Sequence, residues 1–260
     1  MKYTISYVVG LQFLGFRFSG WQKQTNAKTL HDMVDKTLSF VFDNQKYKTI
    51  GVGRTDAKVS ANMYYFQLFI TETLDEVCFM NVLNANFSAD FRAISIRKVD
   101  VTFNIINAPK IKEYHYYFSF GEKNHPFAAP FLVNVDEILD INIMKQAANL
   151  FQGEHYFHKY CTKPSENTVF KRTIDSCEIV ENAILTANFF PEKSYILKVR
   201  GKGFLRYQIR LIMATLFEIG KGNLGLAFIK ASLKETNDRK FSRNIAPASG
   251  LQLHTIELLL

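Results

Sequence analysis

The order of predicted strands and helices constrains the fold of this chain more than any single motif does. Periodicity of apolar residues, together with capping and turn residues, defines the first set of elements. They are a strand over 3–9, a helix over 30–42 with Thr29 and Asp32 at its start, strands over 48–52 and 59–70, a helix opened by Thr73 and Glu76, and a strand over 94–99. The first half therefore reads β-α-β-β-α-β.

The second half repeats this order with insertions. Its predicted elements are a strand over 112–120, a helix over 140–151, strands over 173–180 and 183–199, a helix over 204–219, a short helix over 226–233 and a strand over 250–259. A β-α-β-β-α-β order is the ferredoxin-like unit, and sheets of this type often bind RNA. We expect an α+β fold of two such RRM-like units side by side, 1–107 and 108–260, with helices on one face and a cleft on the other.

Composition narrows the classes of partner. Hydrophobic residues make up 47% of the 260 residues, which is enough for a core, and the formal net charge of +8 favours an anionic partner such as nucleic acid, although it also suits an ordinary basic enzyme. Three cysteines without a C-x-x-C pair support neither a disulfide framework nor a zinc ribbon. Because the N-terminus lacks a signal-peptide core and every apolar stretch is interrupted, we expect a cytoplasmic protein without membrane association.

An acidic loop lies between the two strands expected over 48–52 and 59–70. It reads G-V-G-R-T-D over 51–56, and loops held between rigid strands often carry catalytic groups. Taken alone, the pattern fits a structural turn with a local ion pair better than a phosphate loop, because the third glycine and the following helix of a phosphate fingerprint are missing.

Two further segments combine cations with aromatic residues. The first, F-R-F-S-G-W-Q-K-Q over 16–24, suggests core packing for Trp21 and phosphate contacts for Arg17 and Lys23. The second runs from 198 to 210 and holds five cations and no acid. A glycine-flanked helix start within it would be a natural phosphate site, although a solvated basic face is the more usual explanation. On that helix Arg206 and Arg210 would lie one turn apart, with Arg210 near the core boundary, where an arginine needs a carboxylate partner.

Other chemistries find little support. His155, His158 and Cys161 have spacing that suggests a metal, but no fourth ligand is evident, so no metal site is expected. The chain contains neither a G-x-S-x-G segment nor a Walker A motif, which disfavours serine hydrolase and ATP-dependent activities.

The motifs taken together resemble the TruA family of tRNA pseudouridine synthases, from the first strand to the last. The matching segments are F-S-G-W-Q-K-Q over 18–24, G-R-T-D over 53–56, K-E-Y-H-Y over 112–116, G-K-G-F-L through the arginine at 201–210, and A-P-A-S-G-L-Q-L over 246–253. The resemblance implies that Asp56 is the catalytic carboxylate, that Tyr114 stacks on the target base and that Arg210 pairs with Asp56. The cations beside these motifs, Arg17, Lys23, Arg54, Lys58, Lys202 and Arg206, are the candidates for RNA contact.

The family resemblance also implies a reaction and its partners. The reaction is a cofactor-free isomerisation of uridine to pseudouridine, in which the nucleotide is flipped into the cleft and attacked by Asp56. The implied substrate is the anticodon stem and loop of tRNA, bound by a homodimer. The chain departs from the family pattern after Asp56, where Lys58 stands in place of the usual glycine and Ser60 in place of the usual histidine. It also departs at 103–106, which reads F-N-I-I instead of F-H-A-R, and at 153–157, which reads G-E-H-Y-F instead of G-x-H-D-F. Two alternatives stay open, namely another RNA or position as target, and a non-catalytic RNA-binding homologue.

Overall fold

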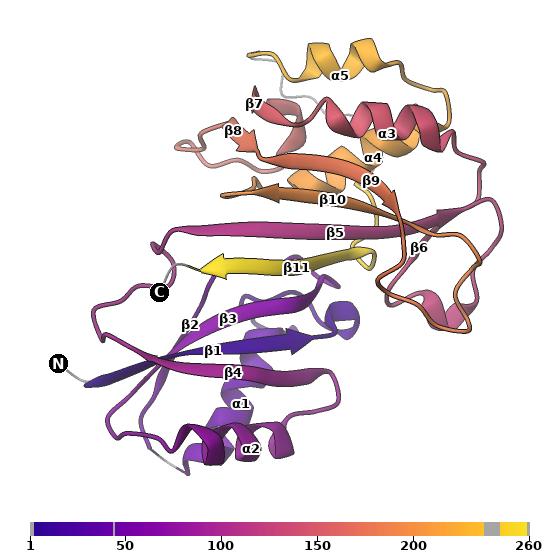
Figure 1. Cartoon of the computed structure of the whole chain (residues 1–260). Helices are drawn as coiled ribbons and strands as arrows, with labels where there is room; N and C mark the ends of the chain where they lie inside the picture. Colours follow the sequence, from indigo (N-terminus) through magenta and orange to yellow (C-terminus); the bar gives the residue numbers. More distant parts are fainter. Residues whose placement is uncertain (1–2, 44, 237–244, 259–260) are drawn as a thin grey trace. The chain divides into compact units, whose positions relative to one another are not determined.

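The computed structural model describes residues 3–43, 45–236 and 245–258. The chain is α+β, with strands in a mixed sheet and five α-helices among the described residues. It forms two compact units, Met1–Lys110 with Leu253–Leu260, and Ile111–Gln252 (Figure 1). The part of the chain that the structure describes holds no helix long and apolar enough to cross a membrane.

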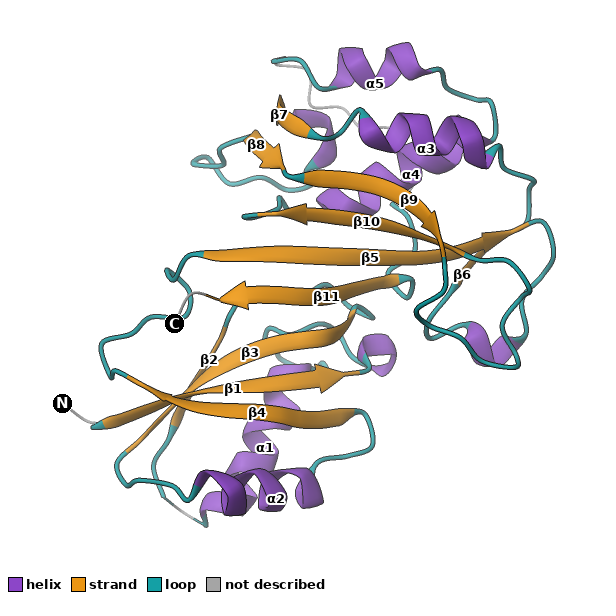
Figure 2. Cartoon of the chain, in the orientation of Figure 1, coloured by secondary structure: helices purple, strands orange, loops and turns teal. Residues whose placement is uncertain are grey.

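Unit 1 is built on a strand that is buried along nearly its whole length. This strand, β1, pairs antiparallel with β3 on one side and β4 on the other, and β2 extends the sheet by pairing with β3. Two helices complete the unit, and α2 packs against both α1 and β4 (Figure 2). The elements are β1 (Ile5–Phe13), α1 (Leu30–Phe42), β2 (Lys48–Gly51), β3 (Ser60–Ile70), α2 (Glu76–Asn86) and β4 (Phe91–Val99), with a 3-10 turn η1 at Gly15–Arg17.

Helix α1 shows how local sequence sets an element. Its buried residues are Leu30, Val34, Leu38 and Phe42, which recur every four positions and so form one apolar stripe. The hydroxyl of Thr29 accepts a hydrogen bond from the Asp32 amide and caps the first turn, as predicted.

Unit 2 is built on the long strand β5, which pairs antiparallel with β10, and β10 pairs in turn with β9. The short strand β6 runs parallel to β5. Tyr116 and Phe118, on one face of β5, meet Phe217 of α4 edge to face, so the predicted aromatic face of this strand is confirmed. The elements are β5 (Lys110–Phe120), β6 (Val133–Val135), α3 (Ile141–Asn149), β7 (Gly153–Tyr156), β8 (Lys171–Ile174), β9 (Ser176–Glu181), β10 (Tyr195–Gly201), α4 (Gln208–Gly220) and α5 (Leu226–Ser232), with 3-10 turns η2 at Pro126–Ala128 and η3 at His158–Tyr160. The last strand, β11 (Leu251–Leu258), belongs to unit 1 from Leu253 onward.

Several predicted boundaries are wrong. Helix α2 is capped by Asp75, whose carboxylate accepts from the Cys78 amide, and not by Thr73. The strand predicted over 183–199 begins only at Tyr195, because the side chain of Asn182 accepts from two amides of the next residues and turns the chain out of the sheet. The stretch predicted as one strand over 173–180 is broken at Asp175.

The start of α4 is the correction that matters most for the site. Sequence pattern predicts a helix from 204, flanked by glycine, but α4 begins at Gln208. Tyr207 precedes it in the left-handed conformation, with φ of 63°. The carbonyl oxygen of the Gln208 side chain accepts from the Leu205 amide at 2.7 Å, which stabilises an irregular approach to the helix. The helix start is therefore not flanked by glycine, and the geometric reason given for a phosphate site at 201–204 does not hold.

Candidate active site

Asp56 lies half-buried in the loop that joins β2 to β3 in unit 1. Its carbonyl oxygen accepts a hydrogen bond from the Val59 amide at 3.3 Å, so residues 56–59 form a turn. The third residue of this turn, Lys58, has φ of 67°. A positive φ at this position is typical of turns that carry glycine or asparagine there.

The segment 18–21 holds this turn from the other side. The Phe18 carbonyl accepts from the Lys58 amide at 2.9 Å, and the Thr55 carbonyl accepts from the Trp21 amide at 3.3 Å. Gly20, with φ of 90°, lies so close that a Cβ there would sit 2.5 Å from the Thr55 carbonyl oxygen. Glycine at position 20 is therefore required both by its backbone conformation and by the close approach of the acidic loop.

Trp21 forms the apolar support beneath the loop. Its ring is 2% exposed and stacks on His31, with ring centroids 5.2 Å apart and planes 16° apart. It also contacts Tyr64, whose hydroxyl donates to the Gly53 carbonyl at 2.5 Å. The core role predicted for Trp21 is confirmed, and through Tyr64 this core reaches the acidic loop itself.

His31 connects the aromatic support to a polar network. Its Nε2 lies 2.7 Å from the Thr49 hydroxyl, and that hydroxyl donates to the carboxylate of Asp35. Burial lowers the pKa of His31 below its ordinary value, and the charge of Asp35 opposes this effect.

The two departures from the family pattern that follow Asp56 have different structural roles. Ser60 is buried, and its Oγ accepts a hydrogen bond from the Gly15 amide at 3.0 Å, so this serine ties β3 to η1. Lys58 occupies a left-handed position that costs a lysine about 1 kcal/mol or more relative to glycine. The family's usual glycine suits this backbone, and the lysine stands there at a cost.

The cations of unit 1 that were predicted to contact RNA fall into two groups. Arg17 pairs with the nearly buried carboxylate of Asp90, and Lys23 pairs with Asp35. Arg54 and Lys58 are exposed, and neither forms an ion pair with any residue that the structure describes. Arg54 and Lys58, which belong to the same loop as Asp56, are therefore the cations of this group that form no ion pair with a described residue.

Tyr114 lies half-buried on β5 of unit 2, opposite Val199 of β10. Its ring meets Phe204 edge to face, with centroids 5.4 Å apart and planes 86° apart. Phe204 belongs to the irregular approach to α4 and therefore sets the orientation of the tyrosine ring.

Arg210, on the first turn of α4, is tied to the segment that follows residue 244. Its Nε donates to the Ala246 carbonyl at 2.7 Å, and its guanidinium carbon lies 5.0 Å from the centre of the Tyr207 ring. The hydroxyl of Tyr116 donates to the Pro247 carbonyl at 2.8 Å. Burial raises the pKa of Tyr116 far above its ordinary range, which keeps this hydroxyl a donor at every physiological pH.

The remaining predicted contacts of unit 2 are exposed. Lys202 lies in the bend after β10, and Arg206 lies in the turn before α4, with its guanidinium carbon 5.3 Å from the centre of the Tyr207 ring. Arg206 and Arg210 were predicted to share one helix face, which is wrong because Arg206 precedes the helix. The left-handed Tyr207 separates the two arginines, and each lies over its ring.

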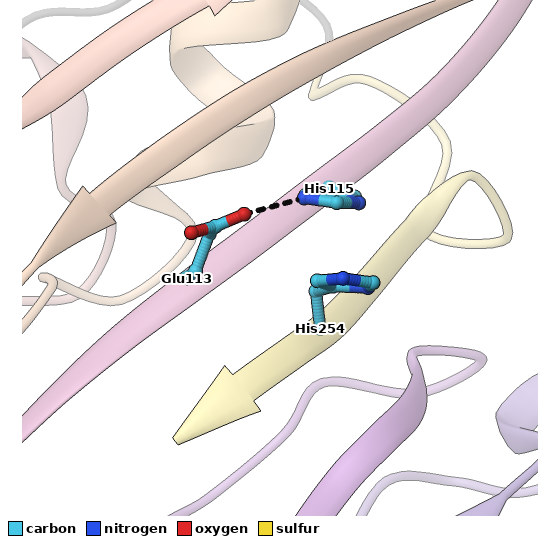
Figure 3. A group of neighbouring side chains, drawn as sticks. All are labelled: Glu113, His115 and His254. Carbon is cyan, nitrogen blue, oxygen red and sulfur yellow. Dashed lines mark hydrogen bonds and ion pairs between the residues drawn. The ribbon is translucent and has the colours of Figure 1, made fainter. Parts of the chain in front are cut away.

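The opposite face of β5 carries an ionisable pair that sequence reasoning missed. His115 is buried, and its Nε2 lies 2.7 Å from a carboxylate oxygen of Glu113 (Figure 3). Arg200, on the neighbouring strand, approaches the other oxygen of that carboxylate at 4.0 Å. Alternation along the strand was a signal that could have placed Glu113 and His115 on one face.

The residues considered for a metal are engaged separately. His155 Nε2 lies 2.9 Å from the Gln152 carbonyl oxygen, and His158 stacks on Phe170. The thiol of Cys161 donates weakly to the next carbonyl, that of Thr162. These contacts give each of the three side chains a local partner of its own.

Comparisons with known proteins agree along nearly the whole chain. The family model described as tRNA pseudouridine synthase matches residues 147–257. The chain is 32% identical to tRNA pseudouridine synthase A of Fervidobacterium nodosum over 93% of this chain and 95% of that protein. It is 30% identical to that of Dictyoglomus thermophilum over 97% and 99%, and 27% identical to that of Shouchella clausii over 95% and 91%. Because identity of this degree spans almost the full length of both partners, the chain belongs to the family of tRNA pseudouridine synthases A.

Proposed function

We propose that this protein isomerises uridine to pseudouridine in tRNA, with Asp56 as the catalytic carboxylate. The observation that carries the proposal is the full-length match to tRNA pseudouridine synthases A, which includes the acidic loop. Packing supports it, since Gly20, Trp21 and Tyr64 hold that loop in one conformation while leaving Asp56 partly accessible. A reactive carboxylate needs such positioning, because misplacement by about 1 Å costs a large factor in rate.

The proposed reaction needs no cofactor. The target nucleotide leaves its stack, and the carboxylate of Asp56 attacks either the base or the ribose C1′. The bond between N1 and C1′ breaks, the uracil rotates, and a bond between C5 and C1′ replaces it. Any bond formed with Asp56 breaks again. The proton of C5 is released to solvent while N1 takes up a proton, so the composition is unchanged and the overall change is an isomerisation.

The roles of the second unit follow from the family resemblance. Tyr114 would stack on the target uracil, and its hydroxyl would hydrogen-bond the freed base. Arg210 would pair with Asp56 and favour its ionised form. The contacts of Phe204 and Ala246 support these roles, because each orients one of the two side chains.

Further parts of the proposal concern the fold and the substrate. We infer two ferredoxin-like units, spanning about 1–107 and 108–260. We also infer an RNA-binding cleft lined by cations that include Arg17, Lys23, Arg54, Lys202 and Arg206. The protein would act as a homodimer in the cytoplasm. The target would be the anticodon stem and loop. The order of helices and strands in each half supports the ferredoxin-like units. Mapping the modified position in unmodified tRNA transcripts tests the substrate, and sedimentation at several concentrations tests the dimer.

Release of tritium from tRNA labelled at C5 of uridine tests the reaction itself, because the C5 hydrogen is lost when the new bond forms. We expect wild-type protein to release label and Asp56→Asn to release none, while the Kd for tRNA stays within about threefold because phosphate contacts dominate affinity. Asp75→Asn is the matched control: asparagine caps α2 as well as aspartate does, so full turnover is expected.

The competing function is that of a non-catalytic RNA-binding protein. The altered residues after Asp56 motivate it. Tight binding of several tRNAs by the wild type without release of label from any of them would favour that alternative and refute the proposed reaction.

A further inference from the structure

We propose that Lys58 is a substrate-binding residue that holds a backbone phosphate of the RNA next to the nucleotide on which Asp56 acts. This inference rests on the proposed function and adds a ligand class, the phosphodiester, for one side chain. Nothing in the family pattern supplies it, because the family usually has glycine at this position.

The first observation is the backbone of Lys58. The residue adopts φ of 67° as the third member of the 56–59 turn, where glycine or asparagine is the ordinary choice. The neighbouring chain enforces this conformation, since the Lys58 amide donates to the Phe18 carbonyl and Gly20 packs against the Thr55 carbonyl. Unfavourable backbone conformations of this kind cluster at functional sites, where the surrounding structure maintains them.

The second observation is the state of its charge. Arg17 and Lys23, which flank the segment that packs against the loop, each form an ion pair with an acidic side chain, Asp90 and Asp35. Lys58 is exposed and has no acidic partner among the residues that the structure describes. An unpaired ammonium beside a site for RNA is suited to a phosphate oxygen, which it binds as a point charge with freedom of direction.

The third observation limits where that charge can act. Lys58 is two residues from Asp56 in a turn closed by a hydrogen bond, and its Nζ lies 5.8 Å from the centre of the Phe16 ring. The turn fixes the backbone of Lys58 two residues from the proposed catalytic carboxylate, and the Phe16 ring offers the ammonium a weak contact. The phosphate within its reach is therefore one adjoining the flipped nucleotide, and not one at a distant part of the RNA.

A purely structural role makes the opposite prediction. If Lys58 were present for its contact with Phe16, replacing it by glycine would destabilise the protein or leave its stability unchanged, without altering RNA binding. A phosphate role predicts that the same change relieves the unfavourable backbone conformation and weakens the binding of tRNA.

Three variants separate these effects. Lys58→Gly removes both the charge and the unfavourable backbone conformation, Lys58→Gln removes the charge alone, and Lys58→Arg retains the charge. We expect Lys58→Gly to raise Tm, and both neutral variants to raise KM for tRNA about tenfold with kcat within about twofold, because a ground-state phosphate contact is lost. Lys58→Arg should keep KM within about threefold. Lys36→Gln is the control, since Lys36 on α1 already pairs with Asp32.

Salt dependence gives a second readout that needs no turnover. The slope of log Kd for tRNA against log salt concentration should fall by about 0.7 to 0.9 in both neutral variants, as expected for the loss of one phosphate contact, and stay unchanged in Lys36→Gln. Unchanged slopes and unchanged KM in Lys58→Gly and Lys58→Gln would overturn the inference. If wild-type protein releases no tritium, the proposed reaction fails, but the slopes still decide whether Lys58 binds a phosphate.

Discussion

Replacing Gly20 by alanine should damage catalysis from a position that does not belong to the reacting groups. The added methyl would lie 2.5 Å from the Thr55 carbonyl oxygen, which is 0.9 Å short of the 3.4 Å at which ordinary contact begins. The same methyl would lie 3.1 Å from the carbonyl carbon of Asp56. Because Trp21 anchors the segment of Gly20 in the core, we expect the acidic loop to move rather than the glycine.

Two effects of Gly20→Ala lower the free energy of unfolding. Alanine in the left-handed region at φ of 90° costs about 1–2 kcal/mol, and the crowding costs about 1–3 kcal/mol more. The expected destabilisation is therefore about 2–5 kcal/mol. Displacement of Asp56 by a large part of 1 Å should lower kcat by about a hundredfold.

Gly222→Ala provides the matched control. Gly222 also has positive φ, 76°, but a Cβ there would meet nothing within 4 Å. It should show the backbone cost of about 1–2 kcal/mol and normal turnover. Urea unfolding measures stability for both variants, and tritium release measures kcat at a temperature where both remain folded.

The decisive comparison is between Gly20→Ala and Gly222→Ala, in both the free energy of unfolding and kcat. Equal destabilisation of Gly20→Ala and Gly222→Ala, with kcat of Gly20→Ala at the wild-type level, would show that segment 18–21 does not position the acidic loop. A loss of stability alone, without loss of kcat, would separate the packing role of Gly20 from catalysis and would equally refute the argument.

Two further predictions concern the residues around this loop. Ser60→Ala leaves the buried Gly15 amide without its acceptor and should lower the free energy of unfolding, measured in urea, by about 1–3 kcal/mol. As a control, replacing the exposed Ser95 of β4 by alanine should change the free energy of unfolding by less than about 0.5 kcal/mol. Because burial holds the pKa of His31 below 6.5 in the folded chain, the unfolded chain takes up this proton first as the pH falls. The contribution of His31 to the free energy of unfolding should therefore decrease from pH 6.5 down to the pKa of the folded state and change no further below it. Urea titrations followed by the fluorescence of Trp21, the only tryptophan, should show a smaller pH dependence in His31→Gln than in the wild type. An identical pH dependence in both proteins would contradict this prediction.

The sequence alone was sufficient for features set by short-range chemistry. The apolar stripe and the Thr29 cap of α1 were predictable, because both depend on residues within a few positions of one another. The aromatic face of β5 followed from the two-residue strand period in the same way. The loop of Asp56 was likewise identifiable from its family motif, because that motif is a run of adjacent residues.

Other features depended on contacts between distant parts of the chain. The start of α4 was misplaced, because local pattern could not show that Tyr207 would adopt a left-handed conformation. Sequence could suggest that Arg17 and Lys23 bind phosphate, but it could not show that they also form ion pairs with Asp90 and Asp35. These pairings join residues that are remote in sequence or separated by a turn, and only packing decides them.

The acidic loop illustrates what the sequence determines and what only the tertiary structure determines. Sequence alone made Asp56 the candidate catalytic carboxylate and showed that Lys58 and Ser60 depart from the family pattern. The tertiary structure decided what those departures mean, since the amide of Lys58 bonds to Phe18 and the hydroxyl of Ser60 receives the amide of Gly15. The physical reason is that a turn takes its backbone angles from the chain that packs against it, and here that chain lies about forty residues earlier in the sequence.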